Sequence, residues 1–125
     1  MSRAPVECFE DLLVWQKGIE LVKEVYRVTG DGRLSRDFGL RDQIQRAAVS
    51  IPTNIAEGFE RGSRKEYVRF LYIAKGSAGE VRSLLRVARE LEYLEAAQHE
   101  QLQSQVLTVS RFLANQIKSL EAKDR

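Results

Sequence analysis

The chain has 125 residues, of which 43% are hydrophobic and 30% are charged, and its formal net charge is +2. A chain of this length and composition can bury one core without disulfides, which excludes a wholly disordered protein. It contains no apolar run of about 18 residues, so we expect no transmembrane segment and a cytoplasmic protein.

Apolar residues at helical spacing predict four helices, at about residues 11–29, 40–60, 64–93 and 96–123. The third has the clearest pattern, because three of every seven positions are apolar or small, as in a bundle helix. Short connections between the second, third and fourth helices favour antiparallel neighbours. The sequence therefore predicts an all-α protein with one domain over residues 1–125, an antiparallel four-helix bundle with up-down-up-down topology.

The second predicted helix contains Pro52 in its interior, where a missing N–H and a crowded ring cost about 3 kcal/mol. We expect the protein to gain a bend or a close helix contact in return. Gly58 in this helix, and Gly76 and Gly79 in the next, favour the close approach of another backbone, since an exposed helical glycine costs about 1 kcal/mol relative to alanine. A bend at Gly76-Ser77 is the alternative.

Charge is unevenly distributed along the chain. Residues 33–89 hold twelve basic and six acidic side chains, whereas the remaining residues hold eight and twelve. The third helix presents a basic row opposite its apolar face, made of Arg69, Lys75, Arg82, Arg86 and Arg89. Guanidinium groups suit phosphates because each offers a planar fork of donors, so this row is our candidate nucleic-acid surface. A solvated face that keeps the protein soluble is the alternative interpretation.

A second group of residues is our candidate for oligomer contacts or packing. Its polar part follows the second helix at spacings of three or four residues, and could form either a ligand or RNA groove or a polar seam within or between bundles; we favour the seam. Tyr72 joins the group because an exposed tyrosine suggests a subunit contact, with base stacking as a weaker alternative. The group is Arg46, Ser50, Pro52, Asn54, Glu57, Arg61 and Tyr72.

Residues for catalysis or metal binding are sparse. His99 and Cys8 are the only histidine and the only cysteine, too few for a zinc or di-iron site. Cys8 has no evident base to activate it, and no partner can be named for Glu57 as a general base. We therefore expect no enzyme, no cofactor and no metal.

Several segments resemble the bacterial four-helix-bundle family that includes the proteins encoded in 23S rRNA intervening sequences. The segments are Trp15-Gln16-Lys17, Gly39-Leu40, Gln43-Ile44, Arg46-Ala47-Ala48-Val49-Ser50-Ile51-Pro52, Asn54-Ile55-Ala56-Glu57-Gly58, Phe70-Leu71 and Ile73-Ala74-Lys75-Gly76-Ser77. The resemblance implies a cyclic homopentamer, related to the basic accessory variability proteins of diversity-generating retroelements, which bind nucleic acid and a reverse transcriptase. The family tends to carry an acid where Arg82 stands, so phosphate binding by Arg82 is not implied by the resemblance.

Together these features predict a non-enzymatic, ring-like homo-oligomer. In one hypothesis the protein binds RNA or DNA through its basic face. In the other it is a protein-interaction scaffold with no nucleic-acid role, and its charges serve assembly alone.

Overall fold

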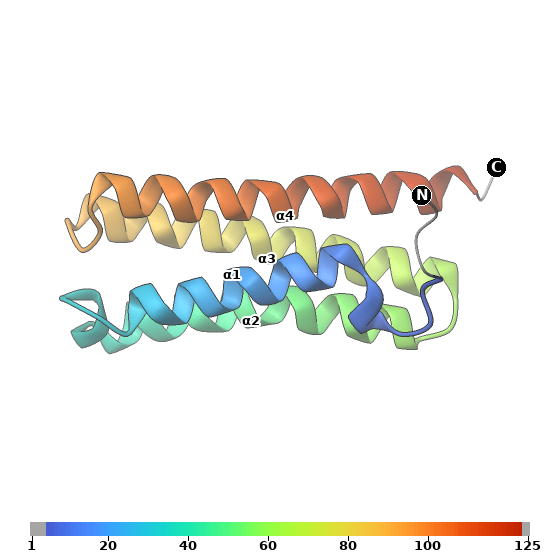
Figure 1. Ribbon diagram of the computed structural model, residues 1–125, viewed down its shortest axis with the longest axis horizontal. Coiled ribbons are helices and arrows are strands. Elements are labelled where there is room, and N and C mark those ends of the chain that lie inside the picture. The colour runs from blue at the N-terminus through green and yellow to red at the C-terminus, as the bar shows by residue number, and fades with distance from the viewer. Residues whose placement is uncertain (1–4, 124–125) are drawn as a thin grey trace.

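The computed structural model describes residues 5–123 and contains four long helices (Figure 1). The helices are α1 (Leu13–Thr29), α2 (Phe38–Glu60), α3 (Arg64–Glu90) and α4 (Ala96–Ala122). Two short 3-10 helices, η1 (Phe9–Asp11) and η2 (Leu34–Arg36), precede α1 and α2. The predicted fold class is confirmed: the described residues form an all-α antiparallel four-helix bundle. Residues 1–4 and 124–125 of the predicted domain lie outside the described part.

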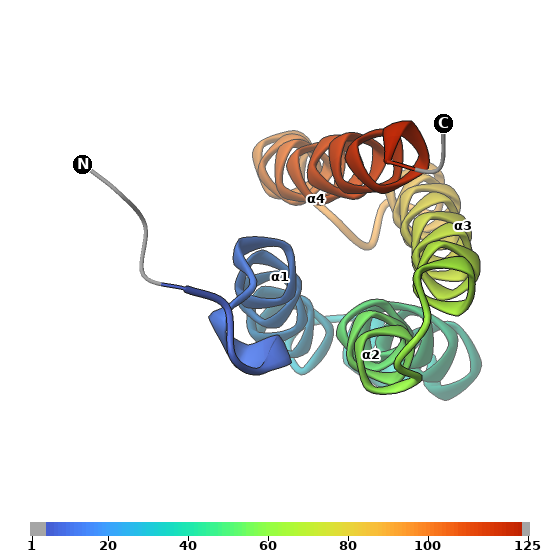
Figure 2. The same cartoon turned by 90° about the vertical axis from the view of Figure 1, so that its right-hand side faces the viewer.

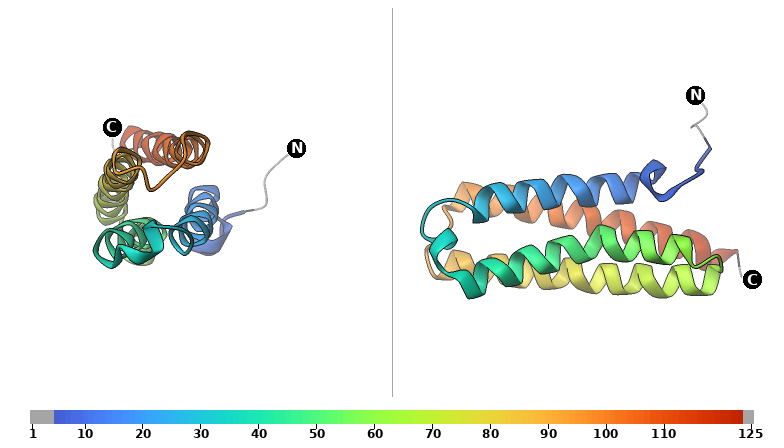
Figure 3. Two further views of the ribbon diagram at one scale, coloured as in Figure 1. Left: turned by 90° about the vertical axis from the view of Figure 1, so that its left-hand side faces the viewer. Right: turned by 90° about the horizontal axis from the view of Figure 1, so that it is seen from below.

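The helices follow one another around the bundle in chain order, so each packs beside its neighbours in sequence (Figures 2 and 3). The α1–α2 and α3–α4 connections lie at one end, at the left of Figure 1, and the α2–α3 turn lies at the other. The tightest pair is α2 with α3, whereas the seam between α1 and α4 is the loosest. The α2–α3 pair is therefore the most tightly packed part of the bundle, with α1 packed on α2 and α4 packed on α3.

Side-chain caps fix where the helices begin. The Asp37 carboxylate accepts a hydrogen bond from the Leu40 amide at 3.1 Å, so α2 begins at Phe38 and not at residue 40 as predicted. The hydroxyl of Ser63 accepts from the Glu66 amide at 3.1 Å and starts α3. The first helix begins at Leu13, two residues later than predicted, because η1 occupies the residues before it.

The third helix ends at Glu90, three residues before the predicted end, because the chain turns sharply there. Glu92 adopts a left-handed conformation with φ of 62°. The amides of Tyr93 and Glu92 donate to the carbonyls of Ala88 and Arg89, both at 2.9 Å, which is the hydrogen-bond pattern of a Schellman motif. Glycine is the usual residue at such a left-handed position, and here it is Glu92. The sequence therefore did not indicate that the helix ends at this point.

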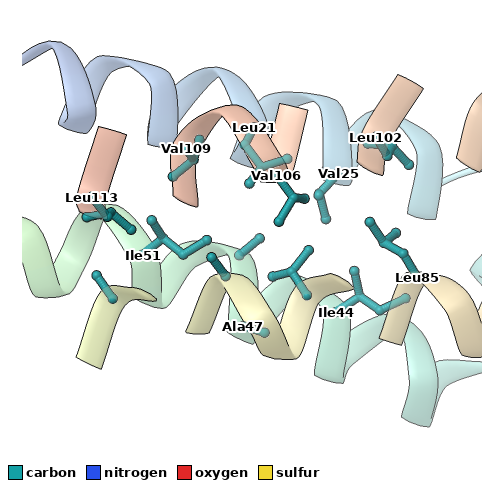
Figure 4. Close-up of a cluster of buried hydrophobic side chains, with 14 of the residues drawn as sticks. Leu21, Val25, Ile44, Ala47, Ile51, Leu85, Leu102, Val106, Val109 and Leu113 are labelled. Atoms are coloured by element: carbon teal, nitrogen blue, oxygen red, sulfur yellow. The ribbon is translucent and has the colours of Figure 1, made fainter. Parts of the chain in front are cut away.

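Interdigitated aliphatic side chains from all four helices form the core (Figure 4). The largest of those with essentially no exposed surface are Leu21, Ile44, Ile51, Ile55, Leu71, Leu85, Leu102 and Leu113. Small residues on α3, including Ala74, Ala78 and Ala88, are also fully buried and leave room for the larger side chains around them. Burial of these apolar side chains is the main contribution that holds the four helices together.

Two helical glycines face a neighbouring helix, and one of them leaves no room for a side chain. A Cβ atom on Gly58 would lie 2.6 Å from the Cβ of Phe70, so α2 and α3 can approach here only without a side chain. A Cβ on Gly18 would lie 3.5 Å from the Cβ and Cδ of the buried Pro52, so the proline packs directly on α1. The expected close approach is thus confirmed for Gly58, whereas the contact of Pro52 with α1 is of ordinary van der Waals length. The expectation is wrong for Gly76 and Gly79 within the chain, since no described atom lies within 4 Å of either added Cβ.

Replacing Gly58 by alanine should lower the free energy of unfolding by about 2 kcal/mol, because the new methyl group would force α2 and α3 apart. Gly76→Ala is the matched control. It should raise the free energy of unfolding by about 1 kcal/mol, since its methyl group meets open space and alanine favours the helix. Urea unfolding followed by circular dichroism measures both. Equal midpoints for Gly58→Ala and the wild type would contradict the close contact.

Replacing Glu92 by glycine should raise the free energy of unfolding by about 1 kcal/mol, because glycine adopts the left-handed conformation without a steric cost. Glu92→Ala tests whether charge or conformation is responsible, since alanine removes the carboxylate and keeps the Cβ. It should leave stability nearly unchanged. Thermal unfolding of the three proteins distinguishes these cases, and an equal gain from alanine would show that the charge is responsible.

Candidate nucleic-acid interface

The predicted basic row lies on α3, at positions between those that this helix buries in the core. Its members are Arg69, Lys75, Arg82, Arg86 and Arg89, of which all but Arg89 are exposed and Arg89 is half-buried. The heptad pattern directs the apolar positions of α3 inward and leaves the basic ones outside. The five residues do not share one face: Lys75, Arg82 and Arg86 border grooves that α4 residues also line, whereas Arg69 lies roughly 100° or more further around the helix, against Phe70.

Three members of the row already have partners within the chain. Arg69 pairs with Glu66 at 3.4 Å, and its guanidinium also lies 5.2 Å from the ring centre of Phe70. Arg86 pairs with Glu90 at 3.0 Å; these two side chains are 67% and 65% exposed, so the pair contributes only a few tenths of a kcal/mol.

The third partnered member, Arg89, holds the α3–α4 connection. Its Nη1 donates to the carbonyl of Leu94 at 3.3 Å, and the side chain of Leu94 is buried. Arg89 therefore has a role in the fold, which the sequence did not reveal because the path of the connection decides it.

Lys75 and Arg82 are exposed and make no ion pair with any residue in the range 5–123. Arg82 and Arg86 line a shallow groove of about 630 Å³ on α3, which Gln103 of α4 borders. Lys75 borders a second groove of about 510 Å³ along the outer face of α4. The free cations thus face solvent beside open grooves, where an extended anionic ligand could reach them.

The polar residues of α2 bond to their own helix. The Ser50 hydroxyl donates to the Ala47 carbonyl at 2.8 Å, and the Asn54 amide donates to the Ser50 carbonyl at 2.7 Å. Glu57 and Arg61 form an ion pair at 2.9 Å along the helix, as their spacing predicts. These bonds all lie within one helix, although the Arg61 guanidinium also lies 5.0 Å from the ring centre of Phe70 on α3. A polar seam within or between bundles stays a prediction. Arg46 is exposed on α2.

Pro52 and Glu57 line a surface groove together with residues of α1 that the sequence analysis did not identify as functional. They line an apolar surface groove of about 490 Å³ between α1 and α2, together with Phe9, Trp15, Ile19, Val22, Val49, Thr53, Ala56 and Glu60. The signal for this groove was present in the sequence, because Trp15, Ile19 and Val22 recur at helical spacing within residues 11–29.

Tyr72 bonds to α4 and not to the α2 residues with which it was grouped. Its hydroxyl donates to the Glu121 carboxylate of α4 at 3.3 Å, near the end of the bundle that holds the α2–α3 turn. The charge of Glu121 raises the pKa of Tyr72 above its ordinary value. The structure therefore does not bring Tyr72 together with Arg46, Ser50 or Asn54.

A contact at the opposite end of the bundle was not predicted. The Tyr93 hydroxyl donates to Asp37 at 3.1 Å and joins the α3–α4 connection to the start of α2. This hydrogen bond raises the pKa of Tyr93. The guanidinium of Arg33 lies over the Tyr93 ring, 5.3 Å from its centre. Asp37 and Tyr93 are too far apart in sequence for local patterns to reveal the pair.

Groups suited to metal binding or nucleophilic chemistry do not gather in the described chain. Among residues 5–123, no three His, Cys, Asp or Glu side chains cluster closely enough to hold a metal ion. Burial and the neighbouring carboxylate of Asp11 raise the pKa of the Cys8 thiol, which lowers its thiolate fraction. Over the same residues, every helix is too short or too polar to span a bilayer.

Four antiparallel helices, with exposed cations on α3 and an apolar groove between α1 and α2, define a small four-helix-bundle protein. The chain belongs to the family described as 23S rRNA-intervening sequence protein, whose sequence model matches residues 10–115. This finding confirms the resemblance noted in the sequence.

A solved structure supports the same relationship. It is a protein of unknown function from the S23 ribosomal protein family of Bacteroides thetaiotaomicron, 26% identical, with a TM-score of 0.78. The similarity covers 85% of this chain and 99% of that one. No curated protein matches the chain.

Substitution by alanine should show that Arg89 contributes to the stability of the fold and that Arg82 does not. Arg89→Ala should lower the free energy of unfolding by about 1 kcal/mol, because the Leu94 carbonyl loses a charged donor. Arg82→Ala should change it by less than about 0.5 kcal/mol, since Arg82 has no ion-pair partner among residues 5–123. Urea unfolding measures both, and equal losses would contradict this division of roles.

Proposed function

We propose that this protein is a non-enzymatic, cytoplasmic homo-oligomer that binds RNA or DNA through the basic face of α3. The observation that carries the proposal is that Lys75 and Arg82 are exposed beside open grooves and make no ion pair with any residue in the range 5–123. Arg86 adds to it, because its exposed ion pair with Glu90 is weak enough to be exchanged for a phosphate contact.

The spacing of the cations suits an extended polyanion. Lys75, Arg82 and Arg89 follow one another every seven residues, which corresponds to about 10 Å between successive members along the helix axis. A nucleic-acid backbone can follow such a row without base-specific contacts, because phosphate contacts position a strand and carry no sequence information. This pattern favours binding that depends on backbone charge and strongly on salt concentration.

Self-assembly would strengthen this surface. The apolar α1–α2 groove, where Val49 is 37% exposed, is the surface that a second copy could cover. We propose a ring-like homo-oligomer, with the cyclic pentamer implied by the family resemblance as the expected state. Repeating Lys75 and Arg82 around a ring would combine a few charges per chain into one strong field.

The first test is binding of the purified protein to a fluorescein-labelled RNA hairpin, by fluorescence anisotropy over a series of salt concentrations. We expect submicromolar affinity near physiological salt, and a fall of log affinity with log salt. The Lys75→Glu/Arg82→Glu variant should bind at least tenfold more weakly. Its salt slope should be smaller by about 1.4 to 1.8, if each cation contacts one phosphate.

The matched control is Lys23→Glu/Lys118→Glu, which changes the net charge equally through exposed lysines of α1 and α4. It should keep most of the affinity, and light scattering should show the same mass for all three proteins. Failure of the wild type to bind even at low salt would contradict the nucleic-acid role. Loss of the oligomer in the Lys75→Glu/Arg82→Glu variant would favour the alternative, a protein-interaction scaffold whose charges serve assembly.

A further inference from the structure

The bundle end that carries the α1–α2 and α3–α4 connections has an unusually exposed aromatic ring. Phe38, the first residue of α2, is 64% exposed, the largest fraction among the large hydrophobic residues in the range 5–123. It contributes little to the core, so packing gives no reason for an aromatic side chain at this position. A solvent-facing ring of this kind offers a flat apolar surface for a ligand.

The ring is held in place by a cation. The guanidinium of Arg41, one turn further along α2, lies 4.8 Å from the centre of the Phe38 ring. Arg41 is itself fixed, because its Nη1 donates to the Ser35 carbonyl at 3.1 Å and its Nη2 pairs with Asp42 at 3.2 Å. The arginine therefore supports Phe38 in one orientation while most of the ring faces solvent.

Further cations surround this end. Arg33 lies over the Tyr93 ring, and Arg36 is exposed and makes no ion pair with any residue in the range 5–123. The carboxylates beside the ring are engaged: Asp37 accepts from Tyr93 and from the Leu40 amide, and Asp42 pairs with Arg41. Arg33 and Arg36 are therefore available to contact phosphates next to Phe38.

The basic row of α3 leads to the same end. Arg86 and Arg89 lie in the last two turns of α3, and Tyr93 follows in the connection that bonds to Asp37, the residue before Phe38. The C-terminal end of the row and the residues Arg33, Arg36 and Phe38 therefore lie at the same end of the bundle. Duplex bases are stacked on one another and cannot lie on the ring, whereas an unpaired base can.

We propose that Phe38 is a stacking platform for an unpaired base of single-stranded nucleic acid, with Arg33 and Arg36 contacting the adjoining phosphates. The proposal rests on the proposed function and names its ligand class, a strand with at least one unpaired base. Stacking on an aromatic ring is tolerant of sequence, because every base has a π face.

The test compares two probes, a single-stranded RNA that contains 2-aminopurine and a fully paired duplex of the same sequence. For the single strand, Phe38→Ala should weaken binding about tenfold and remove the quenching of 2-aminopurine fluorescence. Phe38→Leu should lose the quenching too, because it keeps an apolar side chain without a ring, whereas Phe38→Trp should keep it. Duplex affinity should be the same for all of these variants.

Ile73→Ala is the control for the loss of an exposed apolar side chain, since Ile73 is 41% exposed and lies in the half of α3 that begins at the α2–α3 turn. It should leave both affinities unchanged. Circular dichroism and light scattering check the fold and the mass of each variant.

The outcomes separate the two proposals. A wild type that binds neither probe overturns the proposed function. A wild type that binds the single strand, together with Phe38→Ala of equal affinity and equal quenching, overturns only the stacking platform. A change of oligomer mass in Phe38→Ala without a change in affinity also overturns it, and would assign the ring to a contact between copies.

Discussion

The structure depends most on the close approach of α2 and α3 at Gly58. At this point a single methyl group would collide with the Cβ of Phe70, so the separation of the two helices is set by the absence of a side chain. The same pair has the tightest packing in the bundle, and α1 is added to it through the contact of Gly18 with Pro52. The position of the outer face of α3, and of the cations on it, follows from this central pair.

Whether a cation on α3 is available to a ligand depends on the carboxylates within one turn of it. Arg69 and Arg86 each have a glutamate three or four residues away and pair with it, whereas Lys75 and Arg82 have none that pairs with them among the described residues. A count of basic residues therefore overstates the charge that a polyanion would meet. The local arrangement of acids decides where on the helix face binding is favourable.

Much of the fold follows from the sequence, because the period of the apolar residues determines which faces are buried. The helix ends were less predictable. The start of α2 depends on the cap by Asp37, and the end of α3 depends on a left-handed glutamate at Glu92, where glycine is the usual signal. The Glu57–Arg61 pair could be predicted since both residues lie on one helix. The roles of Arg89 and Tyr93 could not, because their partners are brought close only by the path of a connection.

The loose seam between α1 and α4 has a consequence for the motions of the bundle. Segments with few packing contacts open at a lower free-energy cost than the core does. The amide protons of α1 and α4 that face this seam should therefore exchange with solvent deuterium through local opening, while those of α2 and α3 exchange only when the whole domain unfolds. The bundle would then consist of a rigid central hairpin and two more mobile outer helices. The basic face of α3 belongs to the rigid part, which would keep its cations at fixed spacing while the outer helices fluctuate.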